Sequence, residues 1–355
     1  MGAPDHNVIS PSDTVVDLRG VWKIYRQKQR SAELRDVFRN LWRAPVRTVE
    51  ALRGIDLAVA RGEVVAYAGP NGAGKSTTVK LLSSLLAPDR GTVRVLGMDP
   101  IRDRTRYVSH IGVVFGQRTE LWWDQPIAAS YEWKRVVWDI PRARYERMLG
   151  LVRELLGLGE FINSLARELS LGQRMRADLG MALLHEPEIL FLDEPTLGLD
   201  VLAKRDMLRF VTELNRERQV TVMVTSHDMS DLEQLAGRVV MIHRGNIAFD
   251  GAFDRLRREF ADRRRLLLET ADGAAPALAG AELLTSDAGR HEYVFDAGQV
   301  KIAALLAQAA EQATVLDVET HRAPIDDVIA DIYERWQREA PAGAPTRAAA
   351  EPSAP

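Results

Sequence analysis

Short apolar runs separated by a helix-like pattern are the clearest feature of the chain. The runs Ile189–Leu192 and Val220–Thr225 flank a helix pattern from Ala203 to Arg218. A strand, a helix and a second apolar strand in this order are typical of a βαβ unit with a buried parallel sheet. Two earlier apolar runs, Val64–Ala68 and Ile111–Phe115, also predict strands. The pattern therefore predicts an α/β fold.

A helical segment interrupts this α/β pattern. From about Leu121 to Arg167 the sequence is rich in Trp and Arg and has helical periodicity, with breaks at Pro126 and Pro141. We interpret it as a helical subdomain, about residues 118–168, within a domain that covers residues 14–252. Further strands of this domain are predicted over Val15–Tyr25, Ala51–Ala60 and Thr92–Val95.

A basic insert lies between two of the predicted N-terminal strands, and we assign it to residues 27–50. Apolar residues three and four positions apart predict an amphipathic helix with a basic far face. Such a helix could lie on an anionic membrane surface or dock on a membrane subunit, or it could be an ordinary surface helix of its own domain. The apolar positions are Leu34, Val37, Phe38, Leu41 and Trp42.

The composition changes after Gly251 and predicts an accessory domain over residues 253–338. The expected order is β-α-β-β-α-β, which suggests a small α+β ferredoxin-like module followed by a helix. Residues 1–13 and 339–355 are expected to be disordered tails. The predicted elements are a basic helix over Phe253–Arg265, a strand at Leu266–Leu268, a helix near Pro276–Ala281, strands at Leu283–Ser286 and His291–Asp296, a helix over Val300–Ala313, a strand over Thr314–Glu319 and a helix over Ile325–Trp336.

The strongest chemical signal directly follows the strand Val64–Ala68. Glycines at three positions let successive backbone N–H groups turn toward a phosphate at the start of a helix. Lys75 would contact the β- and γ-phosphates, and the Ser76 hydroxyl would be one ligand of Mg²⁺. The whole phosphate-binding loop is Gly69, Pro70, Asn71, Gly72, Ala73, Gly74, Lys75, Ser76 and Thr77.

A pair of carboxylates indicates the reaction. Asp193 and Glu194 end the apolar run Ile189–Leu192, at the strand edge where ligands bind in open α/β sheets. Asp193 would hold Mg²⁺ or its water, and Glu194 would polarise the water that attacks the γ-phosphate. Together with the phosphate loop, the pair predicts hydrolytic attack on the γ-phosphate of a bound nucleotide.

Composition narrows the class of protein. The chain has no cysteine, which excludes disulfides, thiolate metal sites and a Cys nucleophile. Its net charge of −3, with both signs mixed, gives no argument for nucleic-acid binding. No stretch approaches the ~18–20 apolar residues of a membrane span, and the start lacks the order of a secretory signal. We therefore expect a cytosolic protein, and any membrane role must come through a partner.

Five further motifs follow the order found in ABC ATPases, and over residues 15–250 the chain resembles this family, a P-loop NTPase fold. The resemblance implies that Tyr25 stacks on adenine, that Gln117 is the Q-loop glutamine and a Mg²⁺ ligand, and that His227 is the switch histidine. Asp200 is then the D-loop aspartate. The signature motif is Ser170, Leu171, Gly172 and Gln173, with Leu171 where the commonest motif has glycine.

The resemblance also implies partners. Ser170 and Gly172 of one subunit would close on the ATP held by Lys75 of a second copy, in a head-to-tail homodimer. The sequences Val114–Asp124 and Leu169–Asp178 resemble ATP-binding subunits of ABC-2-type exporters, some linked to drugs or viologens, whose membrane permease subunits are separate chains. This places the protein at the cytoplasmic face of the membrane. A polysaccharide or teichoic-type exporter and a soluble non-transport ABC ATPase are the alternatives.

Overall fold

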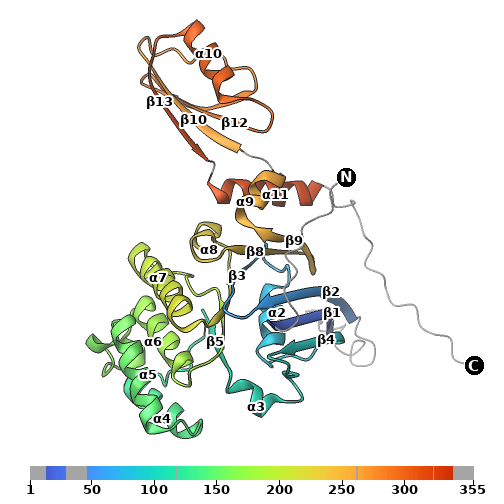
Figure 1. The fold of residues 1–355 in the computed structure, drawn as a ribbon, viewed down its shortest axis with the longest axis vertical. Coiled ribbons are helices and arrows are strands. Elements are labelled where there is room, and N and C mark those ends of the chain that lie inside the picture. Colours follow the sequence, from blue (N-terminus) through green and yellow to red (C-terminus); the bar gives the residue numbers. More distant parts are fainter. Residues whose placement is uncertain (1–12, 29–45, 117, 261–262, 323, 339–355) are drawn as a thin grey trace, which may run out of the picture. The chain divides into compact units, whose positions relative to one another are not determined.

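The computed structural model describes residues 13–28, 46–116, 118–260, 263–322 and 324–338 (Figure 1). Its contacts divide the chain into two compact units, Met1–Phe253 and Asp254–Pro355. Both predicted tails, apart from Asp13, lie outside the described residues. So do Gln117 and the apolar positions of the basic insert. No helix in the described part of the chain is long and apolar enough to span a membrane.

The first unit is built on a mainly parallel sheet. Within the described residues its strand order is β5-β6-β7-β3-β8-β9, and only β9 runs antiparallel to its neighbour. The predicted α/β fold and parallel sheet are confirmed, since β6 and β7 are buried along their whole length. The strands are β3 (Val64–Ala68), β5 (Ile111–Phe115), β6 (Ile189–Asp193), β7 (Thr221–Ser226), β8 (Arg238–His243) and β9 (Asn246–Ala252).

A second, antiparallel sheet lies beside it and has the order β2-β1-β4 (Figure 1). One hydrophobic core joins the two sheets, with Leu18 and Val59 from the antiparallel sheet and Tyr67 and Phe191 from the parallel one. These strands are β1 (Thr14–Lys28), β2 (Val46–Ala60) and β4 (Arg90–Val95).

Strands β1 and β2 correct the bounds of the basic insert. They pair up to Lys28 opposite Val46, so residues 27–28 and 46–50 belong to the hairpin and not to an amphipathic helix. β-Branched residues such as Val46, Thr48 and Val49 favour a strand at this end. The helix predicted within the insert falls on residues outside the described part.

Helices connect the strands of the first unit. The two prolines that the sequence marks as breaks are the N-caps of α4 and α5, where a missing N–H costs nothing. The helices are α2 (Lys75–Leu82), α3 (Arg104–Val108), α4 (Ile127–Val137), α5 (Arg142–Leu155), α6 (Leu171–Leu183), α7 (Val201–Arg218) and α8 (Met229–Leu235), with 3₁₀ turns at Leu158–Glu160 and Ala166–Glu168.

The second unit contains an antiparallel sheet of order β11-β12-β10-β13 among its described residues. Strand β12 lies between β10 and β11, as in a split βαβ arrangement, and Leu305 of α10 is buried in its core. The elements are α9 (Phe253–Phe260), β10 (Arg263–Thr270), β11 (Ala281–Asp287), β12 (Arg290–Asp296), α10 (Ile302–Gln312), β13 (Val315–Arg322) and α11 (Ile325–Arg338).

One predicted helix of this unit is wrong, and another was predicted too long. The helix expected near Pro276–Ala281 is an irregular connection, because Pro276 lacks an N–H and the Ala277 and Ala279 amides are bonded to glutamine side chains of α10. The Pro276 carbonyl accepts from the Tyr293 hydroxyl at 2.6 Å. The basic helix ends at Phe260 and β10 begins at Arg263. The module is therefore ferredoxin-like in strand order, but the described residues 271–280, between β10 and β11, form no helix.

Candidate active site

The phosphate loop lies between β3 and α2, and two of its glycines are fixed by close backbone neighbours. A Cβ on Gly69 would stand 2.3 Å from the Ile242 carbonyl oxygen of β8. Gly74 has φ +122°, and a Cβ there would stand 2.7 Å from the Ala51 carbonyl oxygen of β2. Gly74 is also the N-cap of α2 and has no side-chain cap, so the first amides of α2 are left for an anion.

Lys75 is the buried cation of the site. Its side chain is 6% exposed, and its ammonium donates to the Gly69 carbonyl at 2.7 Å. Glu194 Oε1 lies 3.8 Å from the same nitrogen. Burial lowers the pKa of Lys75, while Glu194 and Asp193 oppose the shift. A cation buried this deeply favours an anionic ligand.

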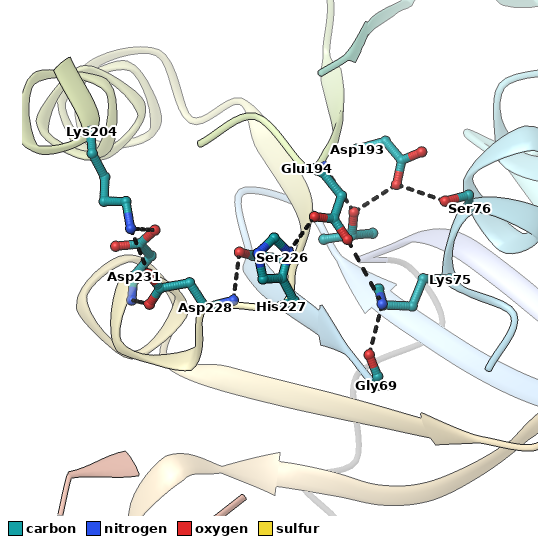
Figure 2. A network of polar contacts seen from close by, with 11 residues as sticks. Gly69, Lys75, Ser76, Asp193, Glu194, Lys204, Ser226, His227, Asp228 and Asp231 are labelled. Carbon is teal, nitrogen blue, oxygen red and sulfur yellow. Dashed lines mark hydrogen bonds and ion pairs between the residues drawn. The ribbon is translucent and has the colours of Figure 1, made fainter. Parts of the chain in front are cut away.

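Asp193 joins the ends of three elements, as Figure 2 shows. Its Oδ1 accepts from the Ser76 hydroxyl of α2 at 3.2 Å and from the Thr225 hydroxyl of β7 at 2.7 Å. A hydroxyl and a buried carboxylate beside a phosphate loop are oxygen donors of the kind that Mg²⁺ prefers. The residues present therefore fit a magnesium ion that arrives with the nucleotide.

Glu194 is held in an unusual backbone conformation. Its φ is +57°, a left-handed value that costs a non-glycine residue of order 1 kcal/mol, and its amide donates to both Thr225 oxygens at 3.0 and 3.1 Å. A Cβ on Gly116 would stand 2.2 Å from the Glu194 carbonyl oxygen, so the turn that follows β5 also lies close to this residue. Its Oε2 lies 2.6 Å from His227 Nδ1. The carboxylate is thus fixed between Lys75 and His227 (Figure 2).

A cleft of about 660 Å³ opens over these groups. Gly116 and Arg118, which flank Gln117 in the chain, line it together with Glu194. Sequence reasoning missed Arg118 and Thr225. The pairing of Thr225 with Asp193 depends on the register of β6 and β7, which the sequence alone does not fix. The other lining residues are Asn71, Ser76, Lys80, Leu85, Phe115, Asp193, Leu197 and His227.

The signature residues lie at the start of α6. Ser170 is its N-cap and forms a capping box with Gln173, with hydrogen bonds of 3.2 and 2.9 Å. The Leu171 side chain packs against the loop before α7, since a Cβ on Gly198 would stand 2.8 Å from Leu171 Cδ2. Within the described residues, none of Ser170, Gly172, Gln173 and Asp200 belongs to the network of Figure 2.

Two other predicted residues lie in ordinary structural positions. Asp200 is exposed and caps α7, where its Oδ1 accepts from the Ala203 amide at 2.8 Å. Tyr25 is half-buried on β1 opposite Val49. Because Ala51 of the same hairpin touches the phosphate loop, the hairpin brings Tyr25 to that side of the unit.

A buried polar cluster lies directly after Gln117. Asp178 of α6 is 8% exposed and accepts from the Thr119 hydroxyl at 2.8 Å and the Glu120 amide at 3.2 Å. Burial raises the pKa of Asp178 to about 7, against the lowering effect of these hydrogen bonds. Lys134 of α4, also buried, lies 3.3 Å from Glu120. The cluster ties α6 to the segment that carries Gln117.

Comparison with known proteins agrees with this geometry. Residues 52–197 match the family model described as "ABC transporter". The chain is 31% identical over 210 residues to the ABC transporter ATP-binding protein NatA of Bacillus subtilis (strain 168), a match that covers 59% of this chain and 85% of NatA. It is 36% identical over 248 residues to the daunorubicin resistance ATP-binding protein DrrA3 of Streptomyces coeruleorubidus, covering 68% of this chain and 77% of that protein.

A solved structure has the same fold. The structure of an ATP-binding subunit of an ABC transporter superposes with a TM-score of 0.57 at 24% identity, over 70% of this chain and 93% of that one. The phosphate loop, the adjoining carboxylates and this similarity lead to one conclusion. The chain belongs to the family of ABC transporter ATP-binding proteins and is an ATP-hydrolysing subunit of a transporter.

Proposed function

We propose that two copies of this chain bind MgATP between them and hydrolyse it to drive export of a drug or xenobiotic-like substrate through separate membrane subunits of the ABC-2 type. The observation that carries the hydrolytic site is the position of Glu194, between the ammonium of Lys75 and the imidazole of His227. Around it, Ser76 and Asp193 would hold Mg²⁺.

In the proposed reaction, Glu194 orients a water molecule against the γ-phosphorus and takes up its proton. The new P–O bond forms as the bond between the γ-phosphorus and the β–γ bridging oxygen breaks, which releases ADP and phosphate. Lys75 would stabilise the charge on the leaving oxygens, and a magnesium ion held by Ser76 and Asp193 would supply further positive charge there. His227 would act on the γ-phosphate as the switch histidine, and Gln117 would act there as the Q-loop glutamine and a Mg²⁺ ligand.

The remaining predicted residues complete the proposal. Tyr25 would stack on adenine, and the loop amides from Gly69 to Thr77 would bind the phosphates. Ser170, Gly172 and Gln173 would reach the ATP of the second copy, beside Asp200. In a single copy, the network around Glu194 does not include Ser170, Gly172, Gln173 or Asp200, which agrees with a site completed by a partner.

Support for export comes from the similar proteins, and one surface supports docking on membrane subunits. DrrA3 is named for resistance to daunorubicin. Three tryptophans of the helical subdomain are partly exposed, Trp122 at 42%, Trp123 at 51% and Trp133 at 40%. We assign this surface to the membrane subunits, because large exposed aromatics are typical of docking sites. The protein then works at the cytoplasmic face of the membrane.

The test begins with Glu194→Gln, which keeps the shape of the side chain but removes the base. With MgATP it should form a stable dimer on size-exclusion chromatography with light scattering, whereas the surface control Glu217→Gln should hydrolyse ATP like the wild type. A monomeric Glu194→Gln protein under saturating MgATP would count against the sandwich.

A second experiment tests the partner. Tagged Glu194→Gln protein is recovered with MgATP from gently solubilised membranes, and the chains that come with it are identified. Recovery of polytopic membrane chains would support the proposed membrane partners. Recovery of ribosomes or nucleic acid, or of nothing, would refute them. Inverted vesicles that contain those chains should then accumulate a lipophilic cationic dye only with ATP; accumulation of a polysaccharide precursor instead would overturn the drug-export reading.

A further inference from the structure

A lysine outside the predicted motifs connects two segments of the site. Lys204 lies in the first turns of α7, and its amide donates to the carbonyl of the N-cap Asp200 at 2.9 Å. Its ammonium reaches α8, where it lies 2.5 Å from Asp228 Oδ2 and 3.1 Å from Asp231 Oδ2 (Figure 2). The side chain therefore links the segment after Glu194 with the segment after His227.

Both carboxylates are fixed at the start of α8. Asp228 is the N-cap, and its Oδ1 accepts from the Asp231 amide at 3.1 Å. The Asp228 amide in turn donates to the Ser226 hydroxyl at 3.0 Å. Asp228 follows His227 directly, so its position sets the backbone from which the imidazole projects. Holding Asp228 therefore holds His227.

The charges make Lys204 necessary for this arrangement. Asp231 is buried, at 5% exposure, and also forms a hydrogen bond with the Thr196 side chain. Without Lys204, two neighbouring carboxylates would face each other with no cation between them, one of them cut off from water. Burial raises the pKa of Asp231, and the hydrogen bond with Asp228 raises that of Lys204. Repulsion would displace the start of α8.

We infer that Lys204 is a positioning residue for ATP hydrolysis, which holds His227 against Glu194 by fixing Asp228 and Asp231 to α7. The His227–Glu194 contact of 2.6 Å leaves little room for displacement. A misplacement of about 1 Å at a catalytic group can lower a rate by about a hundredfold. The inference rests on the proposed roles of Glu194 and His227.

The test compares substitutions at two neighbouring positions of α7, Lys204 and the exposed Arg205. Lys204→Met should lower kcat for ATP by about tenfold or more, with KM and the Kd for ATP within about twofold of wild type, because the phosphate loop is untouched. Lys204→Arg should restore most of the rate, since its guanidinium reaches both carboxylates. Arg205→Met removes the same charge at the neighbouring exposed position and should leave kcat unchanged.

Two further variants keep the outcome decisive. If Lys204→Met melts below the assay temperature, the double variant with Asp231→Asn removes the buried unpaired charge and should fold, yet remain slow. A wild-type kcat in a folded Lys204→Met protein would overturn the inference about Lys204, as would a loss of kcat in Arg205→Met equal to that in Lys204→Met. Neither result would overturn the proposed function. Wild-type hydrolysis in both Glu194→Gln and His227→Ala would instead overturn the proposed site, and the inference with it.

Discussion

Asp178 allows a quantitative test of the polar cluster beside the site. Its pKa is about 7, against an ordinary value of 3.8, because the carboxylate is buried. The difference is about three pH units, and each unit corresponds to about 1.4 kcal/mol. Ionised Asp178 therefore costs the folded unit about 4 kcal/mol of stability relative to its protonated form.

The sign follows from linkage. Because the folded pKa is raised, the unfolded chain releases this proton first, and the free energy of unfolding falls as the pH rises from about 4 to 7. Asp178→Asn keeps an oxygen acceptor for Thr119 and Glu120 but cannot ionise. Its stability relative to wild type should rise by about 2–3 kcal/mol between pH 5 and 8, and should then remain constant.

Urea unfolding followed by tryptophan fluorescence measures this difference, since Trp122, Trp123 and Trp133 lie in the same subdomain. The same substitution at the exposed Asp124 gives the surface control. A difference between Asp178→Asn and wild type that stays flat from pH 5 to 8 would refute the reasoning. It would mean that the carboxylate is solvated, or stabilised in its ionised form by a cation, in the folded protein.

Three further changes follow from the geometry. Gly69→Ala forces a methyl group against the Ile242 carbonyl, so ATP affinity in calorimetry should fall at least about tenfold, or about 1.4 kcal/mol; unchanged affinity would show that the loop yields freely. Ser170→Ala removes the N-cap of α6 and should cost about 1 kcal/mol in urea unfolding, most of it regained in Ser170→Asp. Arg238→Leu separates two carboxylates from their partner and should cost about 2 kcal/mol. A melting temperature equal to wild type would contradict that estimate.

The sequence predicted those parts of the fold that local patterns determine. The strand Ile111–Phe115 has the predicted bounds, and the apolar runs before Asp193 and His227 are buried strands. The failures lie where local signals were weak or overridden. Alanines near Pro276 suggested a helix, but α10 satisfies the same amides with side chains.

The residues of the site also divide into those that a local sequence pattern predicts and those that only the fold brings together. The phosphate loop and the carboxylates carry local signatures, so each could be assigned from neighbouring residues. Thr225 and Lys204 act through partners 32 and 24 residues away in sequence, which only strand register and helix packing bring together. A single sequence holds no pattern for such pairs. Supporting residues of a site are therefore the part that requires a structure.

The pairing of β1 with β2 has a consequence for protein engineering, because it brings the two ends of the intervening segment together. Lys28 and Val46 are paired across the two strands, and paired residues of an antiparallel ladder lie only about 4.5–5.5 Å apart. A two-residue Asn-Gly turn is long enough to join them. A variant that joins Lys28 to Val46 through such a turn is therefore expected to keep the register of the strands that carry Tyr25 and Ala51. Lys28 and Val46 are thus the two points between which a replacement turn can be introduced into this unit.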